Sequence, residues 1–584
     1  LAAGLAKVRN IMKNGFLFLC AFTITSCSSS PYPHIDFSDW DRSPECCQTT
    51  GKKIAIASGG GFSSKAGLEI EESGGNIVDV AIASAFALAV ERPHSLGLGG
   101  GGFLLFSFAG KKSGQGFVDF RETAPLAAKT NMYLDPTGKP LTQMSRYGIL
   151  SVATPGFVPG LYFIHQRWGK LSWETLLQPA IRLARKGFPI YPSLAKAIRE
   201  EKGFLIKQAY LKNIFFRHDE PLQKGDLLIQ SDLADTLERI SLNPKTELVS
   251  GLTATRIAEY MKQNGGLLSL SDLSSYRAKI RKPLRFNWRK KEFLLPPPPS
   301  AGGVITIQML QMLSHDSSEL TDQSSKIHLL AEVMKRAYAD RAEFIGDPDF
   351  SKLNLNSILT RSYALKKRRT IKTNKASSPE EAQPLDSSKL RDRHTTHLSI
   401  LDDKGNGISM TLTINDHFGS RLAVPGTGFF LNDEMDDFSI QPGVPNLFGL
   451  IGSQANSIEP LKRPASSMTP TLVLDGKKAI LAIGAAGGSR ITSHVFQVLN
   501  SLFENPSSGL KPALFAPRIH HQWIPNELQL EKGFDSEIIA NLRSLGHIVK
   551  ESDKTALVQA VFRDSVGNLE AVFDPRDEGG AQAK

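Results

Sequence analysis

Two threonine residues carry the first chemistry that this 584-residue chain suggests. Thr395 opens a run in which polar and apolar side chains alternate, and Thr413 lies near the end of a second such run. A threonine at a chain terminus can act as a nucleophile because its own α-amine takes the proton from its hydroxyl group. Cleavage of the His394–Thr395 peptide bond would create that terminus. The alternative is an ordinary hairpin with a threonine-rich solvent face, since threonine is common in strands.

The two runs must form a hairpin for these threonines to meet. Residues 402–406 are polar and include a glycine, which is typical of the turn between antiparallel strands. Pairing Leu401 with Gly407 places Thr395 opposite Thr413, with Cβ atoms about 4.5–5.5 Å apart. The same register separates the side chains into two faces. The apolar face has the pairs Ile400/Ile408, Leu398/Met410 and Thr396/Leu412, and the other has Ser399/Ser409, His397/Thr411 and Thr395/Thr413.

Several motifs after residue 394 follow one another in a recognisable order. They are 395–397, Asn415 followed by 418–419, 434–438, 463–468 and 487–490. With these motifs the chain closely resembles the small subunit of the γ-glutamyltranspeptidases, N-terminal-nucleophile (Ntn) hydrolases that cut themselves before such a threonine. The resemblance to the family as a whole extends over roughly residues 51–576.

The resemblance implies a catalytic site drawn from both halves of the chain. Thr395 is the implied nucleophile and faces Thr413, while Gly487 and Gly488 would offer backbone N–H groups to the developing oxyanion. A γ-glutamyl group carries an α-carboxylate and an α-ammonium, so its pocket needs both polarities. By resemblance, Arg121, Ser466 and Ser467 hold the carboxylate, and Asn415, Glu434 and Asp437 hold the ammonium. Family members use Gln or Glu at the position of Glu434.

The implied fold is α+β: a four-layer αββα sandwich (Ntn-hydrolase fold) formed jointly by a large subunit segment, 51–394, and a small subunit segment, 395–584. Apolar periodicity predicts helices over 66–72, 77–90, 304–313 and 329–344, and apolar runs predict strands over 103–106 and 479–483. Residues 366–394 are rich in lysine, serine, proline and acidic residues. We therefore expect a mobile linker before the cleavage site.

The first residues have the features of an export signal. Lys13 flanks a short apolar core over 16–22, and 24–27 (Ile-Thr-Ser-Cys) resembles a bacterial lipobox, in which Cys27 would be lipidated. A simple signal peptide is the alternative, and Met12 could be the first residue. We expect export to the periplasm, with 1–27 as the signal, a lipid anchor at Cys27 and a tether over 28–50.

Other functional classes fit the chain less well. A net charge of +11 could indicate nucleic-acid binding, but no basic stripe interleaved with aromatic residues is evident, and we expect no nucleic-acid partner. The segment 97–102 contains a G-x-G-x-x-G pattern, yet it follows a helix and precedes a strand, the reverse of a dinucleotide site. His520 and His521 lack a second cluster with zinc-ligand spacing. We expect no cofactor and no metal.

The resemblance implies a γ-glutamyltranspeptidase and glutathione hydrolase, in which water or an amino-acid or peptide acceptor releases the γ-glutamyl group. Residues 441–460 resemble the lid loop of bacterial members, with Phe448 where several members have tyrosine. One alternative is a cephalosporin-type Ntn acylase. Arg121 and Asp437 argue against it, since both serve an amino-acid head group. The other is a catalytically inactive surface lipoprotein, against which the intact Thr395 and Thr413 argue.

Overall fold

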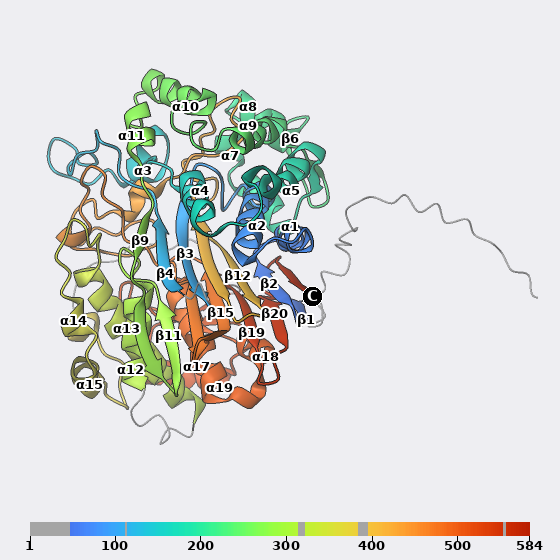
Figure 1. The fold of residues 1–584 in the computed structure, drawn as a ribbon. Helices are drawn as coiled ribbons and strands as arrows, with labels where there is room; N and C mark the ends of the chain where they lie inside the picture. Colours follow the sequence, from blue (N-terminus) through green and yellow to red (C-terminus); the bar gives the residue numbers. More distant parts are fainter. Residues whose placement is uncertain (1–46, 111–113, 314–321, 383–394, 553–555) are drawn as a thin grey trace, which may run out of the picture. The chain divides into compact units, whose positions relative to one another are not determined.

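The computed structural model describes residues 47–110, 114–313, 322–382, 395–552 and 556–584. Two antiparallel seven-stranded sheets form the centre (Figure 1). The sheet that contains the predicted hairpin, here the hairpin sheet, has the order β21-β2-β12-β13-β3-β4-β9. The second, the facing sheet, has the order β1-β20-β19-β15-β14-β11-β10. Strands β12 and β13 contact β15 and β19, so the two sheets pack face to face.

The strands of the two sheets come from both ends of the sequence. The hairpin sheet contains β2 (Ile54–Ser58), β3 (Gly101–Phe108), β4 (Gly114–Phe120), β9 (Lys279–Arg281), β12 (Thr396–Asp402), β13 (Gly407–Thr413) and β21 (Gly580–Ala583). The facing sheet contains β1 (Gln48–Gly51), β10 (Leu284–Trp288), β11 (Lys291–Leu295), β14 (Thr471–Asp475), β15 (Lys478–Ala486), β19 (Leu557–Arg563) and β20 (Leu569–Phe573).

Helices cover the outer face of each sheet. On the hairpin sheet lie α1 (Gly61–Glu72), α2 (Ile77–Glu91) and α4 (Phe157–Trp168), and α5 (Trp173–Lys186) packs on α2. On the facing sheet lie α12 (Gly302–Leu313), α17 (Arg490–Glu504) and α18 (Leu510–Phe515), and α13 (Gln323–Phe344) packs on α12. Figure 1 shows these four layers in order, which confirms the predicted α+β, αββα architecture.

The remaining elements lie around this sandwich. The helices are α3 (Thr142–Arg146), α6 (Pro192–Glu200), α7 (Lys202–Leu205), α8 (Ala209–Phe215), α9 (Ser231–Leu242), α10 (Leu252–Gln263), α11 (Leu270–Ser275), α14 (Leu355–Ile358), α15 (Arg361–Arg369), α16 (Pro379–Ala382) and α19 (Ser536–Ser544). The short strands are β5 (Phe188–Pro189), β6 (Phe216–Arg217), β7 (Glu220–Pro221), β8 (Leu227–Leu228), β16 (Ile519–His520), β17 (Leu528–Glu531) and β18 (Val549–Ser552). Within the described residues, no helix combines the length and apolar character needed to cross a membrane.

The predicted helices and strands are present, with some boundaries shifted. Helix α2 begins after Asn76, whose side chain accepts the N–H groups of Val78 and Asp79. Helix α1 begins five residues before the predicted start at 66. The reason is distant in sequence: the Glu91 carboxylate accepts the N–H groups of Phe62 and Ser63, at 3.0 and 2.9 Å. That contact stabilises a helix start that has no local capping residue.

The hairpin register is confirmed. The ladder pairs Thr396 with Leu412 through to Leu401 with Gly407. However, both faces are buried, and the polar face points at the facing sheet: the Ser409 hydroxyl donates to the carbonyl of Ile483, at 2.9 Å. The alternative of a threonine-rich solvent face is therefore wrong.

His397 lies at the centre of this polar face. Its ring nitrogens are 2.8 Å from Thr411 Oγ1 and 3.0 Å from Ser399 Oγ. Burial lowers the pKa of His397 to about 3, so the ring is neutral at physiological pH. The position of Gly484 on β15 allows this packing, because a Cβ there would lie 2.3 Å from the His397 ring.

The structure describes the first part of the expected linker over 366–394. Residues 366–369 complete α15, and 379–382 form α16. Between them Ser377 accepts from Lys335 and Arg336 and donates its N–H to Glu332, all on α13. These hydrogen bonds connect the stretch to α13. The composition of the segment, which has few apolar residues, did not indicate them. Residues 383–394 lie outside the described residues, as do the export signal, Cys27 and nearly all of the 28–50 tether.

Candidate active site

One small cavity brings most of the predicted site residues together. Its volume is about 20 Å³, which is roughly the space of one water molecule. Nine of the ten predicted residues line it: Arg121, Thr395, Thr413, Asn415, Glu434, Asp437, Ser466, Ser467 and Gly488. The tenth, Gly487, precedes Gly488 in the same loop. Residues that are up to 367 positions apart in the chain therefore meet at one point.

The two threonines lie at the same end of the hairpin. Thr395 directly precedes β12 and is 7% exposed, and Thr413 is the last residue of β13. Thr413 Oγ1 accepts the N–H of Asn415, at 2.8 Å, which turns the chain into the cavity wall. The glycine-rich segment 97–102 packs behind this point. A Cβ on Gly100 would lie 2.1 Å from the carbonyl oxygen of Thr413, so the glycines serve close backbone packing.

Arg121 is the main cation of the cavity. Its guanidinium donates to Glu434 and to Asp437, and also to the carbonyl of Ala465, at 3.1 Å. The side chain is buried, and although burial disfavours its charge, the neighbouring carboxylates raise its pKa above the usual value. The residues assigned to opposite ends of the donor are thus paired with each other in the substrate-free site.

The acids of the cavity are strongly perturbed. Burial raises the pKa of Glu434 to about 7, with Arg121 acting against the shift and Asp437 adding to it. Burial also raises the pKa of Asp437, again opposed by Arg121. Glu434 Oε2 is buried and has no hydrogen-bond partner among the described residues. That oxygen is therefore available to a donor group such as an ammonium.

The serine pair is held by the proline-rich segment before α12. The N–H of Ser466 donates to the carbonyl of Pro299, at 3.0 Å, and the carbonyl of Ser466 accepts from Ala301, at 2.8 Å. The carbonyl of Ser467 accepts from the hydroxyl groups of Thr469 and Thr492, at 2.8 and 3.2 Å. These backbone contacts fix both serines beside Arg121, where their hydroxyl groups can supplement its charge.

The glycine loop joins β15 to α17, as predicted. Gly487 and Gly488 have φ values of +136° and +58°, which non-glycine residues rarely adopt. The loop lies directly before the start of a helix, α17, where the helix dipole favours negative charge. The arrangement suits an oxyanion better than a cation.

The loop over 441–460 closes the cavity and is fastened at several points. Asn446 donates to Asp437, at 3.0 Å, and the N–H of Leu447 donates to Asp436, at 2.7 Å. The carbonyl of Phe448 accepts from Gln522, at 3.0 Å. Hydrogen bonds thus connect the loop to Asp437, which lines the cavity, and to its neighbour Asp436.

Four lining residues were not predicted from sequence: Arg341, Leu450, Met468 and Ile491. Leu450 belongs to the closing loop and Met468 to a motif already noted, so both follow from their neighbours. Ile491 lies at the start of α17. Arg341 lies on α13, most of whose residues are buried. A basic residue in such a helix can indicate a functional site, but only the tertiary fold shows that Arg341 lines this cavity.

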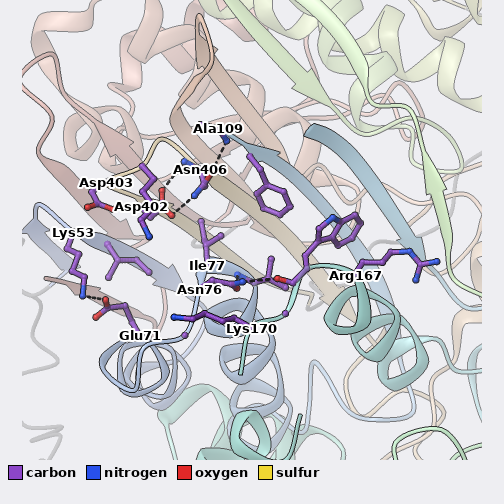
Figure 2. Close-up of a pocket in the computed structure, with 17 residues that line it drawn as sticks. Lys53, Glu71, Asn76, Ile77, Ala109, Arg167, Lys170, Asp402, Asp403 and Asn406 are labelled. Atoms are coloured by element: carbon purple, nitrogen blue, oxygen red, sulfur yellow. Dashed lines mark hydrogen bonds and ion pairs between the residues drawn. The ribbon is translucent and has the colours of Figure 1, made fainter. Parts of the chain in front are cut away.

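A larger cavity, of about 390 Å³, lies at the opposite end of the hairpin (Figure 2). The seven residues of β12 separate it from Thr395 by about 20 Å. Its polar groups largely satisfy one another: Asn406 donates to Asp402, at 2.6 Å, and accepts from the N–H of Ala109, at 2.8 Å. Lys53 pairs with Glu71. Volume alone therefore does not mark the reactive site.

His520 and His521 have structural environments. His520 Nδ1 lies 2.8 Å from Ser493 Oγ, and His521 Nδ1 accepts the N–H of Trp523, at 3.0 Å. Burial lowers the pKa of His520 to about 3. Over the described ranges, no three His, Cys, Asp or Glu side chains are grouped to hold a metal ion.

Comparison with known proteins shows what the chain is similar to in sequence and in fold. The family model described as gamma-glutamyltranspeptidase matches residues 63–584. The glutathione hydrolase proenzyme of Escherichia coli (strain K12) is 38% identical over 529 residues, covering 90% of each chain. That of Pseudomonas aeruginosa is 37% identical over 533 residues, 90% of this chain and 93% of the relative. The solved cephalosporin acylase from Bacillus halodurans superposes with a TM-score of 0.79 at 25% identity, covering 96% of this chain and 99% of that one.

Proposed function

The chain belongs to the γ-glutamyltranspeptidase family, and from this premise we propose how its residues divide the work of the reaction. It is a γ-glutamyltransferase and glutathione hydrolase with a threonine N-terminal nucleophile, made from one precursor, as the name proenzyme says of its relatives. The family predicted from sequence is confirmed. The assignment of steps to residues is our proposal.

The reaction begins at Thr395. After cleavage of the 394–395 bond, the α-amine of Thr395 takes the proton of its hydroxyl group, and Oγ1 attacks the γ-carbonyl carbon of the donor. The N–H groups of Gly487 and Gly488 stabilise the oxyanion, and a lost donor of this kind costs about 2.7–4 kcal/mol. The amine leaves with the proton, and a γ-glutamyl ester remains on Thr395. Water or an acceptor amine then attacks the ester and frees Thr395.

Donor recognition uses both polarities of the cavity. Arg121, Ser466 and Ser467 take the α-carboxylate, since a guanidinium donates two parallel hydrogen bonds to such a group. Glu434, Asp437 and Asn415 take the α-ammonium. The cavity of about 20 Å³ is too small for a γ-glutamyl group, so the loop over 441–460 opens to admit the donor. Donor binding replaces the Arg121–Asp437 ion pair with two new ion pairs, one between Arg121 and the donor's α-carboxylate and one between Asp437 and the donor's α-ammonium.

The convergence of nine predicted residues, Thr395 among them, on one cavity is the observation that carries this proposal. The test is turnover of a chromogenic γ-glutamyl anilide by the purified, cleaved protein, with a glutaryl amide of a cephalosporin nucleus as the competing substrate. We expect the first to be used and the second to be poor, because the second has no ammonium for Asp437. Preference for the cephalosporin amide would favour acylase function, and no turnover of either would favour an inactive binding protein.

We also propose the boundaries and location expected from sequence. The protein would be exported to the periplasm and cleaved into two chains, the second of which is 395–584. With a lipid anchor the first chain would begin at the lipidated Cys27, and after removal of 1–27 as a simple signal peptide it would be 28–394. Stable anchoring needs more than one acyl chain, as a lipidated terminal cysteine supplies. Labelled fatty acid should enter the wild-type protein but not Cys27→Ala. If it enters neither, and the wild type fractionates with soluble periplasmic proteins, a simple signal peptide explains export.

A further inference from the structure

Arg341 is a second cation at the catalytic cavity and has no part in the proposal above. It lies on α13 near the helix end, lines the same cavity as Thr395 and Asp437, and is 7% exposed. Its Nη1 donates only a long hydrogen bond, 3.4 Å, to the carbonyl of Ile451 in the closing loop. Its Nε is buried with no hydrogen-bond partner in the part of the chain that the structure describes.

Burying a charge without its full set of hydrogen bonds costs folding free energy, which suggests that the Arg341 charge has a function. Burial lowers the pKa of Arg341, and the charge of Asp437 acts in the opposite direction. The influence is mutual, since Arg341 is one of the charges that hold the pKa of Asp437 down against burial. Arg341 and Asp437 are therefore electrostatic partners without a direct bond between them in the closed, substrate-free site.

The partnership becomes important when a donor binds. Asp437 Oδ2 accepts from Arg121 and Oδ1 accepts from Asn446 of the closing loop. The donor's carboxylate must draw Arg121 away, and loop opening must break the Asn446 contact. Asp437 then loses both of its side-chain hydrogen-bond partners. Arg341 stays beside it, because it stands on a 22-residue helix packed into the core rather than on a loop.

We propose that Arg341 is a positioning residue of the donor site, which keeps Asp437 an aligned carboxylate for the donor's α-ammonium and fastens the closing loop through Ile451. The inference rests on the proposed division of roles, and it adds a residue from the large subunit segment to ammonium recognition. It also explains why the cavity keeps two cations although the donor has one carboxylate.

Two anilides separate this role from a merely structural one. γ-Glutamyl anilide carries the α-ammonium, whereas glutaryl anilide is identical except that it lacks that group. The variants are Arg341→Met, which removes the charge, Arg341→Gln, which removes the charge but keeps a donor for Ile451, and Arg341→Lys, which keeps the charge. Self-cleavage on a gel shows which variants fold, and kcat and KM are measured for both anilides.

We expect Arg341→Met and Arg341→Gln to raise KM for γ-glutamyl anilide by about tenfold or more, the scale of losing one partner of a buried charge. Both variants should change KM for glutaryl anilide far less, and Arg341→Lys should retain much of the wild-type preference. If Arg341→Met fails to cleave itself, Arg341→Gln provides the same comparison. An unchanged preference in the charge-removing variants, with both anilides equally affected, overturns the role of Arg341. A wild-type protein that ignores γ-glutamyl anilide overturns the proposed function instead, and the inference with it.

Discussion

The ring of Phe448 lies directly against Gly488. A Cβ at position 488 would be 2.5 Å from two carbons of the ring. The closing loop thus seals the cavity by placing an aromatic face on the loop that we assign to the oxyanion. Phe448 has no hydroxyl group to hydrogen-bond, so the seal depends on packing.

Gly488→Ala tests this contact. The new methyl group would clash with Phe448, and the φ of +58° would be strained, so we expect at least a hundredfold loss of kcat/KM for γ-glutamyl anilide. Gly476→Ala is a matched control, because Gly476 also has a φ of +58° but no atom of the described residues lies within 4 Å of its Cβ position. The control should lose stability and keep activity. Adding Phe448→Ala to Gly488→Ala should recover part of the loss; no recovery would mean that strain alone is responsible.

Maturation is predicted to depend on Thr395. Thr395→Ala removes the hydroxyl group that becomes the nucleophile, so the variant should remain one uncut chain and be inactive. In the wild type, N-terminal sequencing of the smaller fragment should read Thr-Thr-His-Leu. Full activity in a preparation that contains only uncut chain would contradict the need for a free α-amine.

Arg121→Ala should separate donor binding from self-cleavage. The donor's carboxylate loses its charged partner, and an unpaired buried charge costs about 2–5 kcal/mol, or roughly 30-fold to several thousandfold in kcat/KM. Self-cleavage needs no donor carboxylate, so the two fragments should still appear on a gel. Normal turnover by this variant would show that another group holds the carboxylate.

Glu434 should give the enzyme a pH dependence near neutrality. Burial raises the pKa of Glu434 to about 7, so the carboxyl group is neutral below that pH and loses its attraction for the donor's ammonium. We expect kcat/KM to fall as the pH is lowered through 7. The side chain in Glu434→Gln is neutral at every pH, so this variant should not show the fall in kcat/KM near pH 7. Any titration of the Thr395 amine should remain, because the wild type and the variant both have that amine. Identical pH profiles for the two proteins would rule out Glu434 as the titrating group.

The space between the sheets should tolerate no added atom at Gly484. Its Cβ would lie 2.3 Å from His397, and overpacking of a core costs about 1–3 kcal/mol. Gly484→Ala should therefore lower the midpoint of thermal unfolding. Gly203→Ala is the control and should change the unfolding midpoint little. Gly203 is a helical residue, and apart from its own helix no atom of the described residues lies within 4 Å of its Cβ position.

The hairpin register could be predicted from a local signal, the period of two along 396–413. The resemblance supplied the site residues, nine of which line one cavity, and the loop of Gly487 and Gly488 lies between a strand and a helix. The early start of α1 depends on Glu91, and the access of Arg341 to the cavity depends on how α13 packs. Both arise from contacts between distant segments. The Arg121–Asp437 pair was likewise unexpected, because the assignment of roles considered only the site with its donor bound.

The interleaved order of the strands affects how the cleaved protein can unfold and refold. In the hairpin sheet, β12 is hydrogen-bonded to β2, and β13 to β3, so ladders join segments from both sides of residue 395. The facing sheet joins β1 to β20 and β11 to β14 in the same way (Figure 1). The two fragments cannot separate without losing both sheets. Refolding of the uncut precursor is therefore a unimolecular event, whereas the cleaved enzyme must first bring two polypeptides together, and its recovery from denaturant becomes dependent on protein concentration.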